Sequence, residues 1–111
     1  MEVKQFEELK FKANYFSGMN SMGGQLYIYS DRLVFKPHAV NMGSLSDKVI
    51  PIIDIHGYKK GSLTTMYFIL NNGLKIKFAV WEKDAIIQVV EERRQALFQQ
   101  MGKQMPAPLM L

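Results

Sequence analysis

The stretch GGQLYIYSDRLVFKPH, residues 23–38, decides the fold of this chain. Residues rich in β-formers at 25–29 and 32–36 predict two strands, and Ser30-Asp31 between them is a polar link of hairpin length. Pro37 has no backbone N–H to donate, so it marks the end of the second strand. The apolar residues of this hairpin should pair across the strands and face a core. They are Leu26, Ile28, Leu33 and Phe35.

Further strands are predicted on both sides of this hairpin. Residues 9–16 and 74–80 alternate between apolar and polar side chains, which is the period of a half-buried strand. Shorter strands are expected at residues 48–52, 53–58 and 64–70, with a hairpin turn at Asn71-Asn72-Gly73. Glycine, serine and asparagine predict loops at residues 17–24 and 38–47.

The period becomes helical after Trp81, and a helix is expected from Glu82 to Met101. Residues 1–104 therefore form one predicted domain, and residues 105–111 form an apolar tail that contains two prolines. The sequence leaves the place of the tail open. It could dock on its own domain, on a second copy or on a partner groove, or it could be disordered.

Composition sets the limits of what this chain can do. A length of 111 residues fits one domain, and a hydrophobic content of 48% allows a real core. The formal net charge of +4 permits an anionic partner without requiring one. The absence of cysteine excludes disulfides, thiolate catalysis and cysteine-ligated zinc. The first residues lack the apolar core of a signal peptide, so we expect a cytoplasmic protein.

Short motifs follow one another along the chain in a definite order. They are Gly24, Leu26-Tyr27-Ile28, Asp31-Arg32-Leu33-Val34-Phe35, Ile50-Pro51-Ile52-Ile53-Asp54-Ile55, and Gly73 with Phe78. This order resembles the GRAM domains of the pleckstrin-homology-like superfamily, and the resemblance extends from about Leu9 to about Gln100. Lys36-Pro37-His38 with Asn41 resembles a bacterial branch of small stand-alone members.

The resemblance implies a mainly β fold. Two antiparallel sheets, of roughly six or seven strands together, would pack as a sandwich or partly open barrel. The C-terminal helix would then close one open end and hide an apolar flank from water.

Catalytic and metal-binding chemistry finds little support in the sequence. A nucleophile needs a base within hydrogen-bond reach, and neither His38 nor His56 accompanies a serine motif or a phosphate-binding loop. Asp54 and His56 would point from one strand face, but they offer only two metal ligands. We therefore expect no enzymatic activity, no cofactor, no metal and no small-molecule substrate.

The leading interpretation is a non-enzymatic binding module that acts in protein–protein interaction as an adaptor. Such a module would use exposed strand edges, loops or the apolar tail. The candidate interaction residues are Met19, Met22, Leu109, Met110 and Leu111. The two methionines could insert into lipid or a partner, or they could fold back over the open end of the barrel.

The alternative interpretation is peripheral recognition of an anionic membrane or phosphoinositide, which the resemblance implies for some family members. The candidate ligands are Lys10, Lys12, Lys59, Lys60, Lys75 and Lys77. The family members that bind phosphoinositides place basic residues around the first loop. This chain departs from that pattern, because residues 17–24 contain no Lys or Arg, and the departure weakens the membrane interpretation. The same lysines could equally be solvated strand faces that discourage edge pairing.

Nucleic-acid binding is the weakest of the binding interpretations. Tyr27 and Tyr29 near Lys36 suggest base stacking beside charge. The basic residues are scattered, however, and the electrostatic footprint is thin. The sequence therefore disfavours a nucleic-acid partner.

Overall fold

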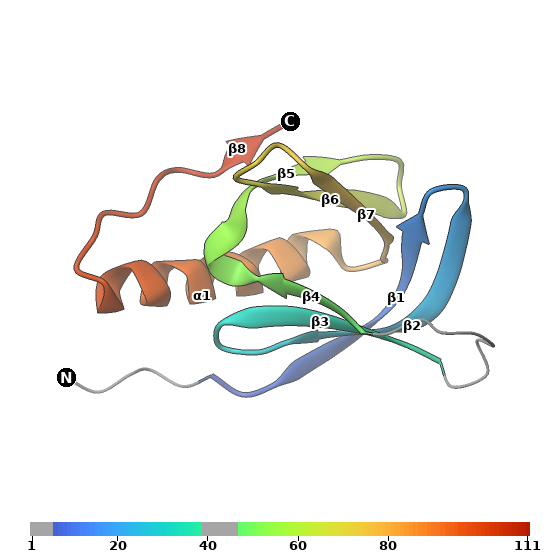
Figure 1. Ribbon diagram of the computed structural model, residues 1–111, viewed down its shortest axis with the longest axis horizontal. Coiled ribbons are helices and arrows are strands. Elements are labelled where there is room, and N and C mark those ends of the chain that lie inside the picture. Colours follow the sequence, from blue (N-terminus) through green and yellow to red (C-terminus); the bar gives the residue numbers. More distant parts are fainter. Residues whose placement is uncertain (1–5, 39–46) are drawn as a thin grey trace.

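The structure, a computed structural model, describes residues 6–38 and 47–111 (Figure 1). Its elements, in chain order, are β1 (Leu9–Ser17), β2 (Asn20–Ile28), β3 (Arg32–Pro37), β4 (Lys48–Pro51), the short 3-10 helix η1 (Ile52–Asp54), β5 (Ile55–Lys60), β6 (Thr65–Leu70), β7 (Lys75–Ala79), α1 (Lys83–Gln100) and β8 (Leu109–Met110). Of the predicted connection at residues 38–47, residues 39–46 lie outside the described part of the chain.

All the strands join one ladder in the order β4-β3-β2-β1-β7-β6-β5-β8. The ladder bends over itself, so that β1 to β4 form one layer and β5 to β7 the other, with α1 along the open side (Figure 1). The neighbours pair antiparallel except β5 and β8, which are parallel. The expected mainly β sandwich with one helix toward the C-terminus is therefore correct. The sequence predicted six or seven strands, and β8, which lies in the expected tail, adds one more after the helix.

The hairpin that decides the fold has the predicted register. Leu26 lies opposite Phe35 and Ile28 lies opposite Leu33, and all of them are buried. At the turn between the strands, the Arg32 guanidinium lies 2.8 Å from the Asp31 carboxylate, and both side chains are largely exposed. Such a surface pair contributes little, on the order of 0–1 kcal/mol. The apolar cross-strand pairs therefore fix the register.

Two predicted segments are wrong. The loop expected at residues 17–24 is a tight turn at Gly18 and Met19, and β2 already begins at Asn20. Gly18 has φ +62°, which suits the first position of a two-residue hairpin turn. The strand expected at residues 53–58 begins only at Ile55, because residues 52–54 form η1.

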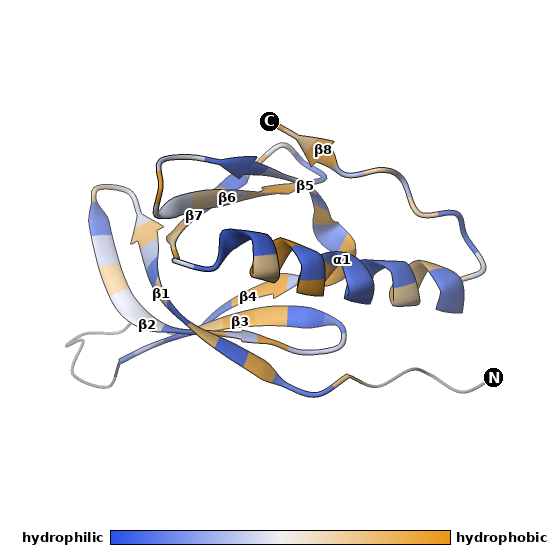
Figure 2. Cartoon of the chain, turned by 180° about the vertical axis from the view of Figure 1, so that it is seen from behind, coloured by the Kyte–Doolittle hydropathy of each residue, from blue (hydrophilic) through white to orange (hydrophobic). Residues whose placement is uncertain are grey.

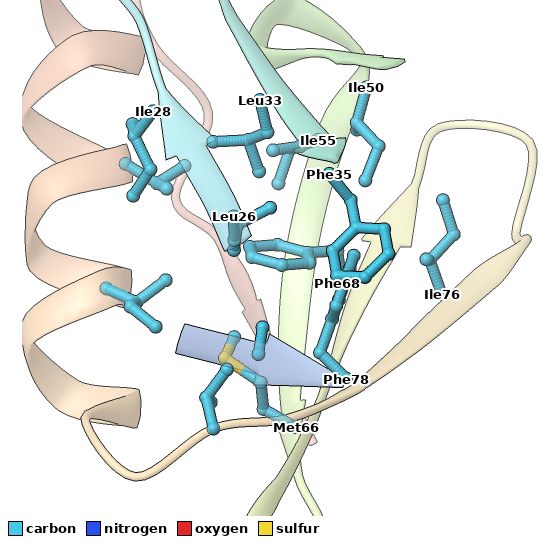
Figure 3. Packing of buried hydrophobic residues seen from close by; sticks show 14 of the residues in the cluster. Leu26, Ile28, Leu33, Phe35, Ile50, Ile55, Met66, Phe68, Ile76 and Phe78 are labelled. Atoms are coloured by element: carbon cyan, nitrogen blue, oxygen red, sulfur yellow. The ribbon is translucent and has the colours of Figure 1, made fainter. Parts of the chain in front are cut away.

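The core lies between the two layers and under α1 (Figure 3). Phe78 packs against Phe35 and Phe68, with ring centroids 5.8 Å and 5.7 Å apart. From α1, Ile86 and Val90 enter the same core cluster. The helix thus covers apolar surface that the bent sheet leaves open, as the sequence predicts.

Candidate binding surfaces

The strands within residues 6–38 and 47–111 carry basic side chains and no acidic ones. The basic residues are Lys10, Lys12, Arg32, Lys36, Lys48, Lys59, Lys60, Lys75 and Lys77. The acidic residues of the described chain lie instead in the N-terminal segment, the connections and the helices. The helix also buries its two arginines, Arg93 and Arg94. Positive charge therefore gathers on the sheet.

Two of the predicted lysines meet around one aromatic ring. Lys59, Tyr67 and Lys77 lie side by side on β5, β6 and β7. The Nζ atoms of Lys59 and Lys77 lie 5.4 Å and 5.8 Å from the centroid of the Tyr67 ring. Lys77 Nζ is also 4.6 Å from the centroid of the Phe16 ring on β1. Lysine ammonium groups at these distances are attracted to the negative ring faces.

The other predicted lysines lie apart from this row. Lys60 turns to the start of α1, where its Nζ lies 2.6 Å from the Asp84 carboxylate. That hydrogen bond lowers the pKa of Asp84. Lys10 and Lys12 are exposed on β1, and Lys75 is exposed at the start of β7. The lysines are thus spread over the sheet and do not form one pocket.

A second row of rings and cations lies on β2, on Tyr29 directly after it, and on β3. Residues two apart on a strand share a face. Tyr27 and Tyr29 accordingly stack, with centroids 6.2 Å apart and planes 13° apart. Lys36 Nζ lies 4.8 Å from the Tyr27 centroid, and the Arg32 guanidinium carbon lies 4.5 Å from the Tyr29 centroid. The sequence signal for stacking beside charge therefore corresponds to a real arrangement.

The two loop methionines behave differently. Met19 is fully exposed in the β1–β2 turn. Met22 lies within β2, where it is partly buried and packs against the core. The sequence left open whether the two methionines project outward or fold back onto the domain. Of the two, only Met22 folds back.

The tail docks on its own domain. Leu109 and Met110 pair with Gly57 and Tyr58 of β5, and the Leu111 N–H donates to the Tyr58 carbonyl at 2.9 Å. The Leu109, Met110 and Leu111 side chains nevertheless stay exposed, so the backbone holds the contact. Gly57 permits it, because an added Cβ there would lie 2.2 Å from the Leu109 carbonyl oxygen. The division of the chain at residue 104 stays a prediction.

A buried polar network lies behind this edge. The Tyr58 hydroxyl donates to the Glu91 carboxylate at 2.6 Å, and Arg94 donates to the same carboxylate at 3.0 Å. Arg94 also donates to the Pro106 carbonyl at 3.4 Å, which links α1 to the chain leading into β8. Burial and the bond to Glu91 raise the pKa of Tyr58 well above its usual range. The Tyr58 phenol therefore stays neutral and keeps its proton, which it shares with Glu91 only through the hydrogen bond.

The two candidate metal ligands, Asp54 and His56, lie on successive elements of the chain. Asp54 lies in η1 and His56 lies in β5, and both side chains are exposed. Within residues 6–38 and 47–111, no three His, Cys, Asp or Glu side chains come close enough to hold a metal ion. In the same part of the chain, neither helix has the length and apolar character needed to cross a membrane.

Comparison with known proteins supports the fold. No protein-family model matches the chain, and no curated protein matches its sequence. Among solved structures, it is similar to the C-terminal domain of an unknown protein from Leishmania infantum, with TM-score 0.67 and 13% identity over 82% of this chain and 85% of that one.

Two further solved structures contain named pleckstrin-homology domains. The linker-DH/PH structure of p115-RhoGEF matches with TM-score 0.64 and 10% identity, over 93% of this chain and 30% of that one. The Vps36 N-terminal PH domain matches with TM-score 0.55 and 12% identity, over 90% and 83%. At such identities the likeness concerns architecture alone. The chain therefore has a pleckstrin-homology-like fold.

Proposed function

We propose that this chain is a non-enzymatic adaptor module of the GRAM type, in the cytoplasm of a bacterium, that binds an extended apolar segment of a protein partner along the edge of β5. The single observation that supports this function is β8. An extended apolar segment already lies on that edge, paired in parallel with Gly57 and Tyr58.

The chemistry of the edge suits strand addition. Main-chain hydrogen bonds supply affinity for any extended segment, and side-chain contacts supply selectivity. Gly57 lets a backbone approach closely, as the contact with Leu109 illustrates. The side chains of residues 109–111 remain exposed and lie outside the core cluster, so their departure leaves that core intact. A partner segment would replace the tail on β5.

The test uses a labelled peptide with the sequence of residues 105–111, added to the full chain and to a chain that ends at Pro108. We expect the peptide to bind the shortened chain more tightly, because its edge is unoccupied. Gly57→Ala in the shortened chain should abolish binding, whereas His56→Ala on the same strand should not. Equal peptide binding by the shortened chain and its Gly57→Ala variant would contradict the proposal.

A second candidate is peripheral contact with an anionic membrane. The observation that favours it is the set of strands with basic and no acidic residues. Each lysine near an anionic surface contributes about 1 kcal/mol, and salt screens that attraction. We expect co-sedimentation with anionic but not neutral vesicles, weaker at higher salt and lost on charge reversal of Lys10, Lys12, Lys75 and Lys77. If the unchanged chain does not co-sediment with anionic vesicles, this candidate function is wrong.

A further inference from the structure

The most exposed large hydrophobic side chains of the described residues gather at one end of the molecule. They are Met19, which is fully exposed, Leu63, which is 82% exposed, and Trp81, which is 79% exposed. Each comes from a different connection: the β1–β2 turn, the β5–β6 turn and the β7–α1 link. Figures 1 and 2 place all three connections at the same end of the long axis.

The connections that carry the leucine and the tryptophan are braced against each other. The Val80 N–H donates to the Thr64 carbonyl at 2.7 Å, which joins the end of β7 to the β5–β6 turn. The Lys83 ammonium donates to the Ser62 carbonyl at 2.6 Å, which joins α1 to the same turn. The exposed apolar side chains are therefore held out by an ordered backbone.

A shallow pocket of about 380 Å³ lies beside the tryptophan. Lys12 and Asn14 of β1 line it together with Thr64 and Trp81. The pocket thus combines one cation and polar groups with an indole ring. Tryptophan has an apolar body and one N–H donor, so it is favoured where one side is apolar and the other is wet.

Positive charge surrounds this end. Lys12 lies in the pocket wall, while Lys59, Lys60 and Lys83 flank the β5–β6 turn. Two acidic residues lie nearby, Glu82 and Asp84. Asp84 is already paired with Lys60 at 2.6 Å, so the lysines outnumber the free carboxylates.

We propose that this end of the molecule inserts Met19, Leu63 and Trp81 into the facing leaflet of an anionic bilayer, at the level of the headgroups. The surrounding lysines then contact the lipid phosphates. This inference rests on the second candidate function and gives it an orientation, with the long axis pointing into the membrane. The apolar side chains stand on separate turns around a projecting end, a shape that fits a deformable lipid surface, and the lysines complement its charge.

Trp81 is the single tryptophan of the chain, so its fluorescence reports this end alone. We mix the full chain with phosphatidylcholine vesicles that contain or lack phosphatidylserine, and with anionic vesicles that carry brominated acyl chains. We expect a blue shift with anionic vesicles and quenching by the bromines. Leu63→Ser and Met19→Ser should each weaken vesicle binding about tenfold or more, which follows from withdrawing a large apolar side chain from lipid.

The matched control is Leu74→Ser, in the β6–β7 turn, where Leu74 is 51% exposed. We expect it to bind vesicles as the unchanged chain does. If no vesicle binding occurs, the second candidate function and this inference both fail. The chain could bind anionic vesicles through its lysines while the Trp81 fluorescence neither shifts to the blue nor is quenched. In that case only the inference is overturned. It is equally overturned if RNA produces the same shift, or if Leu63→Ser converts a dimer to a monomer in light scattering.

Discussion

Replacing Gly57 by alanine should act on the tail and on little else. All three of the nearest atoms to an added Cβ belong to Leu109, and the closest is its carbonyl oxygen at 2.2 Å. An ordinary contact starts at 3.4 Å, so β8 would have to retreat by about 1.2 Å. The 2.9 Å bond from the Leu111 N–H to the Tyr58 carbonyl cannot survive such a shift. Alanine at position 57 should therefore release the tail.

The size of the effect is bounded by what the tail contributes. Strain at position 57 cannot exceed the free energy of simply undocking β8. A few main-chain hydrogen bonds contribute about 1 kcal/mol each, and ordering the tail offsets part of this, which leaves about 2 kcal/mol. In a chain that ends at Pro108 the obstacle is absent. Gly57→Ala should there be neutral or stabilising by about 0.5 kcal/mol, because alanine restricts the unfolded chain.

The measurement is a double-mutant cycle by urea unfolding. The variants are the full chain and the chain ending at Pro108, each with glycine or alanine at position 57. We expect a coupling free energy of about 2 kcal/mol between the substitution and the tail. Equal destabilisation by Gly57→Ala in both backgrounds would refute the reasoning, because the tail would then not be the obstructing partner.

Three further predictions concern ionisable side chains that are buried or paired. The pKa of Tyr58 is raised in the folded chain, so its contribution to stability is complete below its ordinary pKa of 10.0 and is lost as pH rises above that value. Above pH 10.0 the unfolding free energy should therefore fall by about 1.4 kcal/mol per pH unit. The fall should be less steep in the Tyr58→Phe variant. Arg93→Ala should lower the urea-unfolding free energy by about 3 kcal/mol, because the buried guanidinium donates to several main-chain carbonyls; a loss below about 1 kcal/mol would contradict this. Lys60→Ala should raise the pKa of Asp84 toward 3.8, as NMR titration would measure. Because that pKa is depressed in the folded chain, the stabilisation from the pair is present above pH 3.8 and is lost as pH falls through the folded value.

The sequence predicted those parts of the fold that local pattern determines. The hairpin from Gln25 to Lys36 has β-forming residues on both sides of a short polar link, and its apolar pairs fall opposite one another as expected. The helix was predicted from Glu82 to Met101 and extends over Lys83–Gln100, because its apolar spacing is regular. In both segments the residues that define the pattern are neighbours in the chain.

The errors arose where tertiary contacts outweigh composition. Residues 17–24 have the glycine, serine and asparagine of a loop, yet residues 20–24 pair with β1 as the first part of β2. Arg93 and Arg94 were not singled out in the sequence, and both are buried although they are charged. Arg93 is bonded to the carbonyls of Glu7 and Tyr29, which lie 86 and 64 residues away. No local pattern reveals partners at such a distance.

The candidate surfaces likewise divide into those that local pattern predicts and those that depend on contacts between distant residues. Alternation alone placed Tyr27 and Tyr29 on one face, and their stacking beside Lys36 follows from it. The place of the tail was open, because the edge that receives it depends on Gly57, about fifty residues earlier in the chain. The gathering of exposed apolar residues at one end depends on how three distant turns meet, which only the folded chain reveals.

The position of α1 in the chain has a consequence for synthesis on the ribosome. The helix follows β1 to β7 and covers the inner apolar surface of the sheet with Ile86 and Val90. A chain made from its N-terminus therefore exposes seven unshielded strands before the helix emerges. The bond from Arg93 to Glu7 cannot form until then either. The core of this domain can consequently be completed only after α1 has been translated.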